Sequence, residues 1–126
     1  MYHDVKLFIA GEWRDASGGV RKPVHDPATE EEIGTIAMAS EEDIDAALAA
    51  ADAGFDEWRR RGSWERAAII RRTADLIRER TDQIATLMSL ETGKPLAEAR
   101  AETGAAADQF EWYSEETKRI YGQTIE

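Results

Sequence analysis

The chain has 126 residues, which is enough for one domain or for part of one. Its 26 acidic and 16 basic residues give a formal net charge of −10, and this field disfavours binding to a nucleic-acid backbone. It contains neither Cys nor Asn, which excludes disulfides, thiolate metal sites, a cysteine nucleophile, an asparagine oxyanion donor and N-glycosylation within these residues.

The first 39 residues predict strands and turns. Four extended segments are expected, over Lys6–Ile9, Glu12–Arg14, Val20–Val24 and Glu32–Ala37. Ala10 and Gly11 join the first two in a tight hairpin, in which the glycine supplies a positive φ. The apolar stretch Leu7–Ala10 is too short for a signal-peptide core, and no run could cross a bilayer. We therefore expect a cytoplasmic location and no membrane contact.

Residues 40–122 predict three long helices. Ser40 is a suitable N-cap with Asp43 three residues on, and Gly62 ends this first helix. The second runs from a Ser63 cap to Thr92, and the third from Pro95 to Gly122. Three- and four-residue spacing predicts the buried faces as Ile44, Leu48, Ala51, Phe55 and Trp58, then Ile70, Ala74, Ile77, Ile84 and Leu87 or Met88, then Ala99, Ala106, Phe110, Tyr113, Thr117 and Ile120.

This architecture is expected to be incomplete. A short antiparallel strand set cannot supply the sheet that three amphipathic helices normally cover. We therefore interpret residues 1–126 as part of a larger α/β domain.

Chemistry-bearing patterns are sparse. His3 and His25 have no second ligand at metal spacing, and the pair Glu98 and Glu102 lacks the histidines of a di-metal carboxylate site. No phosphate-binding glycine loop occurs. We predict no catalytic, cofactor-binding or metal-binding residue in this chain.

One face of the third helix stands apart from its predicted buried stripe. Ala105, Gln109 and Trp112 follow at four- and three-residue steps, so they share one side of the helix. This face could border a cavity, or it could pack against a neighbouring loop, domain or subunit.

Seven ordered motifs resemble the opening of the aldehyde dehydrogenase family. Leu7 to Trp13 is similar to the family's first strand-turn-strand, and Asp26-Pro27-Ala28-Thr29 followed by Glu32-Ile33-Gly34 is similar to its "N-P-A-T-G-E-x-I-G" turn, with Asp for Asn. The others are Ala39 to Ala47, Glu65-Arg66 with Ile70-Arg71, Leu90 to Ala99, Trp112 to Glu116 and Lys118 to Ile125. Gly93-Lys94-Pro95-Leu96 and Lys118 to Gly122 look most like succinate-semialdehyde dehydrogenases.

The resemblance implies chemistry located outside this chain. In the family a cysteine attacks the aldehyde, NAD or NADP takes the hydride, and an asparagine helps to hold the oxyanion; this chain has neither residue type. The segment would be the N-terminal part of the Rossmann-like cofactor-binding domain, with strands and turns over 1–39 and helices over 40–122. Alone it would be inactive and bind no cofactor.

The expected partners follow from the same resemblance: the remainder of the polypeptide, a small aldehyde such as succinate semialdehyde, and further copies in a dimer or tetramer. The resemblance also places the third helix at the substrate entrance, which makes Ala105, Gln109 and Trp112 candidates for lining the channel. The alternative is a stand-alone, non-catalytic helical interaction module of the same ancestry.

Overall fold

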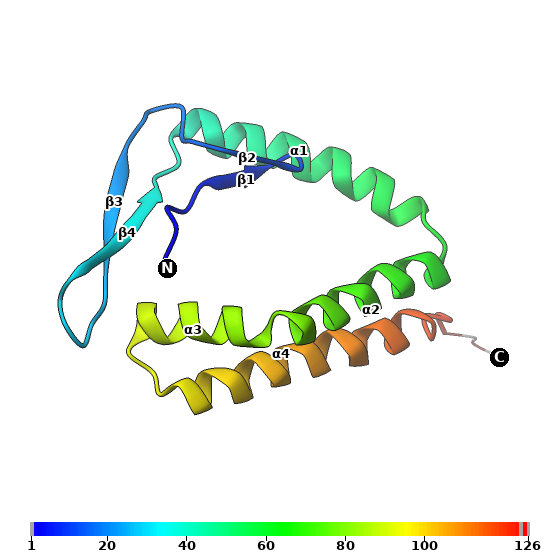
Figure 1. Cartoon of the computed structure of the whole chain (residues 1–126). Helices are drawn as coiled ribbons and strands as arrows, with labels where there is room; N and C mark the ends of the chain where they lie inside the picture. The colour runs from blue at the N-terminus through cyan, green and yellow to red at the C-terminus, as the bar shows by residue number, and fades with distance from the viewer. Residues whose placement is uncertain (1, 124, 126) are drawn as a thin grey trace. The chain divides into compact units, whose positions relative to one another are not determined.

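Over residues 2–123 and 125, which the computed structural model describes, four short strands precede four helices (Figure 1). The strands are β1 (Leu7–Ile9), β2 (Glu12–Arg14), β3 (Arg21–His25) and β4 (Glu32–Ala37); the helices are α1 (Glu41–Arg60), α2 (Ser63–Glu79), α3 (Thr81–Thr92) and α4 (Leu96–Thr117). The chain divides into two compact units. The first unit comprises Met1–Arg59 and Leu90–Gly93, and the second comprises Arg60–Ser89 and Lys94–Glu126.

The strands of the first unit form two antiparallel hairpins, as predicted. In the first, Leu7 lies opposite Arg14. Its turn has Ala10 at φ 54° and Gly11 at φ 86°, and two successive left-handed residues define a type I′ turn. The prediction assigned positive φ to the glycine alone, whereas the alanine adopts it as well.

The second hairpin pairs β3 with β4 and carries a third segment on β4 that the sequence did not predict. Val5 forms a parallel bridge to Ile36. Its amide donates to the Thr35 carbonyl at 2.8 Å, and its carbonyl accepts the Ala37 amide at 3.0 Å. Arg21 Nη2 donates to the same Val5 carbonyl at 3.0 Å. Residues before β1 are therefore part of this small sheet.

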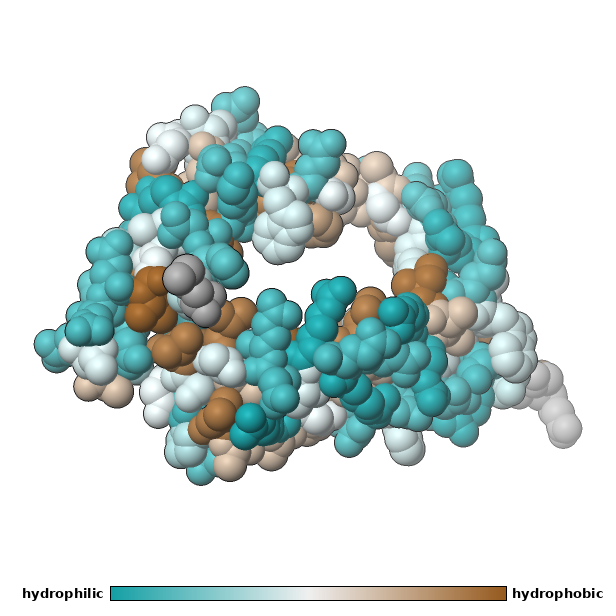
Figure 2. All heavy atoms as spheres, viewed as in Figure 1, coloured by the Kyte–Doolittle hydropathy of each residue, from teal (hydrophilic) through white to brown (hydrophobic). Residues whose placement is uncertain are grey.

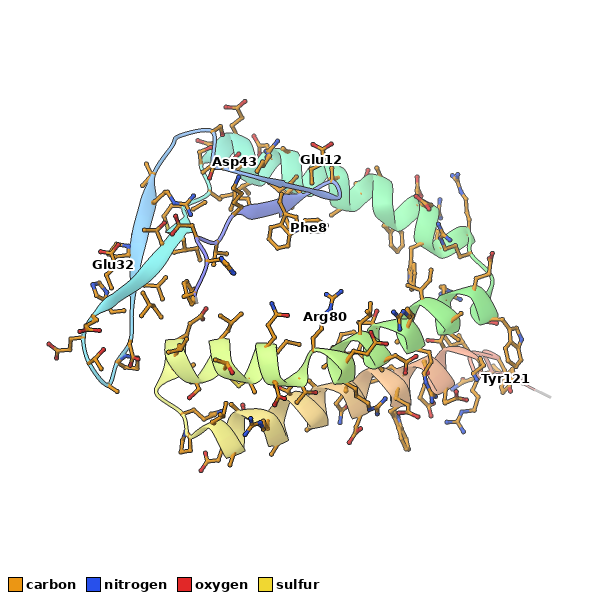
Figure 3. The ribbon with its side chains drawn as sticks, viewed as in Figure 1. Phe8, Glu12, Glu32, Asp43, Arg80 and Tyr121 are labelled. Carbon is orange, nitrogen blue, oxygen red and sulfur yellow. The ribbon has the colours of Figure 1, made fainter. Side chains whose placement is uncertain are left out.

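Helix α1 begins with the predicted capping box. The Ser40 amide and hydroxyl donate to Asp43 Oδ2 at 3.0 and 2.9 Å, and the Asp43 amide donates to Ser40 Oγ at 3.3 Å. Asp43, labelled in Figure 3, is fully buried. It also accepts the Ser17 amide at 3.0 Å and pairs with Arg14 at 3.1 Å, so one carboxylate joins α1 to the chain around β2.

The prediction of three helices is wrong, because the segment from Ser63 to Thr92 is divided at Arg80 (Figure 3). Arg80 leaves α2 with φ −106° and ψ 14°. The next residue, Thr81, donates its hydroxyl to the carbonyls of Ile77 and Arg78, and such back-bonding bends helices. The predicted Ser63 cap is also wrong: Gly62 holds the N-cap position, and its amide donates to Glu65 Oε2 at 3.0 Å.

The core of the second unit lies between α2 and α4, and it is built from small side chains. On α2 the buried residues are Ala67 and Ala74; on α4 they are Ala99, Thr103, Ala107 and Ser114. The predicted α4 stripe is confirmed at Ala99, which is fully buried, but it is wrong at the exposed residues Ala106, Phe110, Tyr113 and Ile120. Small residues let two helix backbones approach closely, so they occupy the seam and leave the bulky residues outside.

Most of the predicted apolar face of α1 is also exposed, although Trp58 is half-buried. Ile44, Leu48 and Phe55 are 52%, 64% and 63% accessible, which marks this face as unpartnered within the described residues. Hydrophobic residues are visible among the hydrophilic surface in Figure 2.

In the second unit, α4 ends at Thr117 and not at the predicted Gly122. The Lys118 and Arg119 amides bond three residues back, to Glu115 and Glu116, which tightens the chain out of the α-helix.

Candidate functional site

The predicted site residues lie on α4 of the second unit. This helix begins after Pro95, whose φ of −54° suits a helix start, and continues through an alanine-rich sequence of high helix propensity. Ala105, Gln109 and Trp112 are all exposed, and Trp112 is 63% accessible. They are therefore separate from the seam that packs on α2.

Trp112 borders an open hollow of about 710 Å³ between the start of α2 and the end of α4. Its lining residues are Trp64, Asp108, Glu111, Trp112, Glu115, Lys118, Arg119 and Tyr121. Gln109 instead lines an apolar groove of about 350 Å³, with Ile70, Phe110 and Tyr113. The two predicted residues thus share a helix but open into different hollows.

The carboxylates of the larger hollow are held in ion pairs. Arg78 donates to Asp108 at 2.7 Å and to Glu111 at 2.5 Å, and these two bonds raise the pKa of the guanidinium. Arg71 also pairs with Glu111, at 3.0 Å. Each of these carboxylates is engaged by a guanidinium, so the groups suit packing and positioning.

A further ion pair lies at the α4 end of the hollow. Lys118 pairs with Glu115 at 2.6 Å, and this bond lowers the pKa of the carboxyl. The same ammonium lies 5.0 Å from the centre of the Trp64 ring, a cation–π distance. Trp64 is 73% exposed, and Tyr121, which is labelled in Figure 3, is 84% exposed, so these two rings leave an aromatic rim open to solvent.

Metal binding finds no support among the residues that the structure describes, where no group of three His, Asp or Glu side chains is arranged to hold an ion. Both histidines, His3 and His25, are exposed. In the same part of the chain, no helix has the length and apolar character needed to cross a bilayer.

Two motifs that the sequence resemblance singled out meet within the first unit. The Asp26–Thr29 turn brings Pro27 so close to Gly93 that a Cβ there would lie 2.9 Å from Pro27 Cγ. Gly93 also has φ 70°, which favours glycine. Asp26 Oδ1 accepts the Ala28 amide at 2.8 Å, so the carboxylate that replaces the family's Asn still forms the turn's hydrogen bond.

Sequence reasoning missed one contact beside this junction. The Tyr2 hydroxyl donates to Glu91 Oε1 at 2.6 Å, although 89 positions separate the two residues. No local pattern relates residues at such a separation, so only the fold could reveal the pair.

Comparison with known proteins agrees with these motifs. The sequence profile of the aldehyde dehydrogenase family matches residues 13–126. The chain belongs to the aldehyde dehydrogenase family. Every motif of the resemblance except most of the β1–β2 hairpin lies inside the matched range.

Its relatives in the aldehyde dehydrogenase family include semialdehyde dehydrogenases. Glutarate-semialdehyde dehydrogenase from Pseudomonas putida is 46% identical over 95% of this chain and 25% of its own length. The NADP(+) succinate-semialdehyde dehydrogenase of Escherichia coli is 44% identical over the same shares. The crystal structure of an NAD-dependent aldehyde dehydrogenase from Sinorhizobium meliloti superposes with a TM-score of 0.93 at 34% identity, over 97% of this chain and 25% of that one. The chain thus spans about a quarter of the length of these relatives.

Proposed function

We propose that this chain serves as the N-terminal part of the cofactor-binding domain of an aldehyde dehydrogenase. The observation that carries the proposal is the family match over residues 13–126, with relatives of which the chain spans about a quarter. The whole enzyme would oxidise an aldehyde to its acid with NAD or NADP. Because two relatives are named for succinate and glutarate semialdehyde, a semialdehyde bearing a distal carboxylate is the proposed substrate.

The chain's own part in this reaction is structural. It has no cysteine to attack the aldehyde and no asparagine to hold the oxyanion, and the carboxylates around its larger hollow are committed to ion pairs. The completed enzyme would be a cytoplasmic dimer or tetramer in which the rest of the polypeptide covers the exposed apolar faces.

The isolated 126-residue chain should therefore neither oxidise succinate semialdehyde nor bind NAD or NADP with micromolar affinity. Titration calorimetry with each cofactor measures the binding, and formation of reduced nicotinamide measures the reaction. Saturable cofactor binding, or aldehyde-dependent reduction of the nicotinamide by the purified chain, would refute the proposal that the chain's part is structural.

We further propose that Ala105, Gln109 and Trp112 border the aldehyde channel of the complete enzyme. Their exposure on α4, away from the α2 seam, supports the proposal, because a channel wall needs side chains that their own unit leaves uncovered. Gln109 and Trp112 also line the two hollows beside α4. The competing role for this face is packing against a neighbouring loop or subunit.

Ala105→Phe in an enzyme that carries this segment tests the channel. A phenyl ring there should narrow the entrance, so KM should rise far more for bulky aldehydes than for acetaldehyde, while NAD affinity stays the same. Ala97→Phe places the same ring about two turns earlier on α4 and should leave selectivity unchanged. Equal effects on all aldehydes would show that the face only packs.

A further inference from the structure

The first residues of the chain form an extended strap along β4. Besides the Val5 bridge, Asp4 Oδ1 accepts both the amide and the hydroxyl of Thr35, each at 2.8 Å. Both bonds lower the pKa of the Asp4 carboxyl, and the bond from the Thr35 hydroxyl has the larger effect. We call residues Tyr2–Val5 the N-terminal strap.

The Tyr2 end of the strap lies against the backbone of β4 at Gly34. A Cβ atom at Gly34 would lie 2.5 Å from Tyr2 Cδ1 and 2.9 Å from Cε1, so the ring can take this place only because residue 34 has no side chain. From there the hydroxyl reaches Glu91 Oε1 at 2.6 Å. The ring is thus fixed at one end by contact and at the other by a charge-assisted hydrogen bond.

Glu91 belongs to the last turn of α3, and the residues around it are held from a second side. Gly93 lies against Pro27 of the β3–β4 turn, as described above. Leu90–Gly93 accordingly belongs to the first unit, although Ser89 before it and Lys94 after it belong to the second.

We propose that the N-terminal strap is a latch: through the contact of Tyr2 with Glu91, it holds residues 90–93 at the end of α3 against the rest of the first unit. The strap lies before Trp13, where the match to the family profile begins. Burial, together with the hydrogen bond to Glu91 and its negative charge, raises the pKa of Tyr2 to about 12. The phenol therefore remains a hydrogen-bond donor across the neutral range.

Hydrogen exchange of the full chain, followed by mass spectrometry, tests the latch. Tyr2→Phe removes only the hydroxyl, and the amides of residues 90–93 should exchange about tenfold faster because the helix end opens more often. Gly34→Ala displaces the ring and should accelerate the same amides at least as much. Tyr121→Phe removes a hydroxyl from an exposed tyrosine of the second unit and should change nothing at 90–93.

The contrary results are equally distinct. If residues 90–93 exchange at the unaltered rate in both Tyr2→Phe and Gly34→Ala, there is no latch. If α1 and the strands accelerate as much as residues 90–93 do, the variants act by general destabilisation, and this too overturns the proposal.

Discussion

Glu30 has a backbone conformation that suits glycine, since its φ is 61° in the turn between β3 and β4. The family motif "N-P-A-T-G-E-x-I-G" has glycine at this very position. Glu30→Gly should therefore raise the free energy of unfolding by about 0.5–1 kcal/mol, as relief of left-handed strain exceeds the added chain entropy. Glu31→Gly is the matched control, because Glu31 has no positive φ. This substitution should lower the free energy of unfolding by about 0.5–1 kcal/mol. Urea unfolding measures the free energy of unfolding of both variants; a lower value for Glu30→Gly than for the parent would contradict this prediction.

Asp43 should govern the acid stability of the first unit. The Ser40 amide, helped by the Ser17 and Ser40 hydrogen bonds, holds the pKa of this carboxyl well below its usual range despite burial. A lowered folded pKa stabilises the fold above the unfolded pKa of about 3.9, and the contribution is lost as the pH falls further. Asp43→Asn should lower the thermal midpoint at pH 7 by roughly 5 °C or more and flatten its decline below about pH 4. Asp45→Asn, on an exposed carboxylate of the same helix, should do neither.

At the scale of single residues, local patterns predicted the contacts of Asp43 with Ser40 but not those with Ser17 and Arg14. The Ser40–Asp43 spacing indicates a capping box, and the structure confirms it. The bonds from Ser17 and Arg14 could not be predicted, because they cross 26 and 29 positions of sequence and depend on how β2 leads into α1.

At the scale of elements, the α2–α4 seam should tolerate no added volume. Ala107 is fully buried there, whereas Ala106 beside it is exposed. Ala107→Leu should cost about 1–3 kcal/mol by overpacking, while Ala106→Leu should stay within about 0.5 kcal/mol of the parent. Chemical unfolding of the two variants compares them directly. Similar losses would mean that the seam is not the close contact described.

The same seam shows why helix faces were predicted less well than helix positions. Strand and helix starts depend on local signals such as Ala10-Gly11, Ser40 and Pro95, and β2 and β4 lie where the pattern indicated. The buried faces depend on what the helices contact. Periodicity favoured the bulky Phe110 and Tyr113, but the structure packs alanines against α2 and leaves the bulky residues exposed. The break at Arg80 could not be predicted from the sequence, because no glycine or proline lies there.

For the whole molecule, the exposed apolar residues predict self-association. Ile44, Leu48 and Phe55 on α1 and the groove of Ile70, Phe110 and Tyr113 remain uncovered in their own units. The isolated chain should therefore form oligomers and bind a hydrophobic dye despite its charge. Sedimentation velocity and dye fluorescence measure this. A monomer with a sharp cooperative melt and no dye binding would favour the stand-alone interaction module.

We propose that this chain supplies the N-terminal quarter of an aldehyde dehydrogenase and none of its reacting groups. The most direct measurement replaces the matching first quarter of the Escherichia coli succinate-semialdehyde dehydrogenase with residues 1–126 and follows NADPH formation from succinate semialdehyde. The chimaera should oxidise the aldehyde with a kcat within about tenfold of the parent, because all groups that touch the reacting atoms are retained. A folded, correctly assembled chimaera without activity would show that residues 1–126 cannot replace this part of the enzyme, and would contradict the proposal.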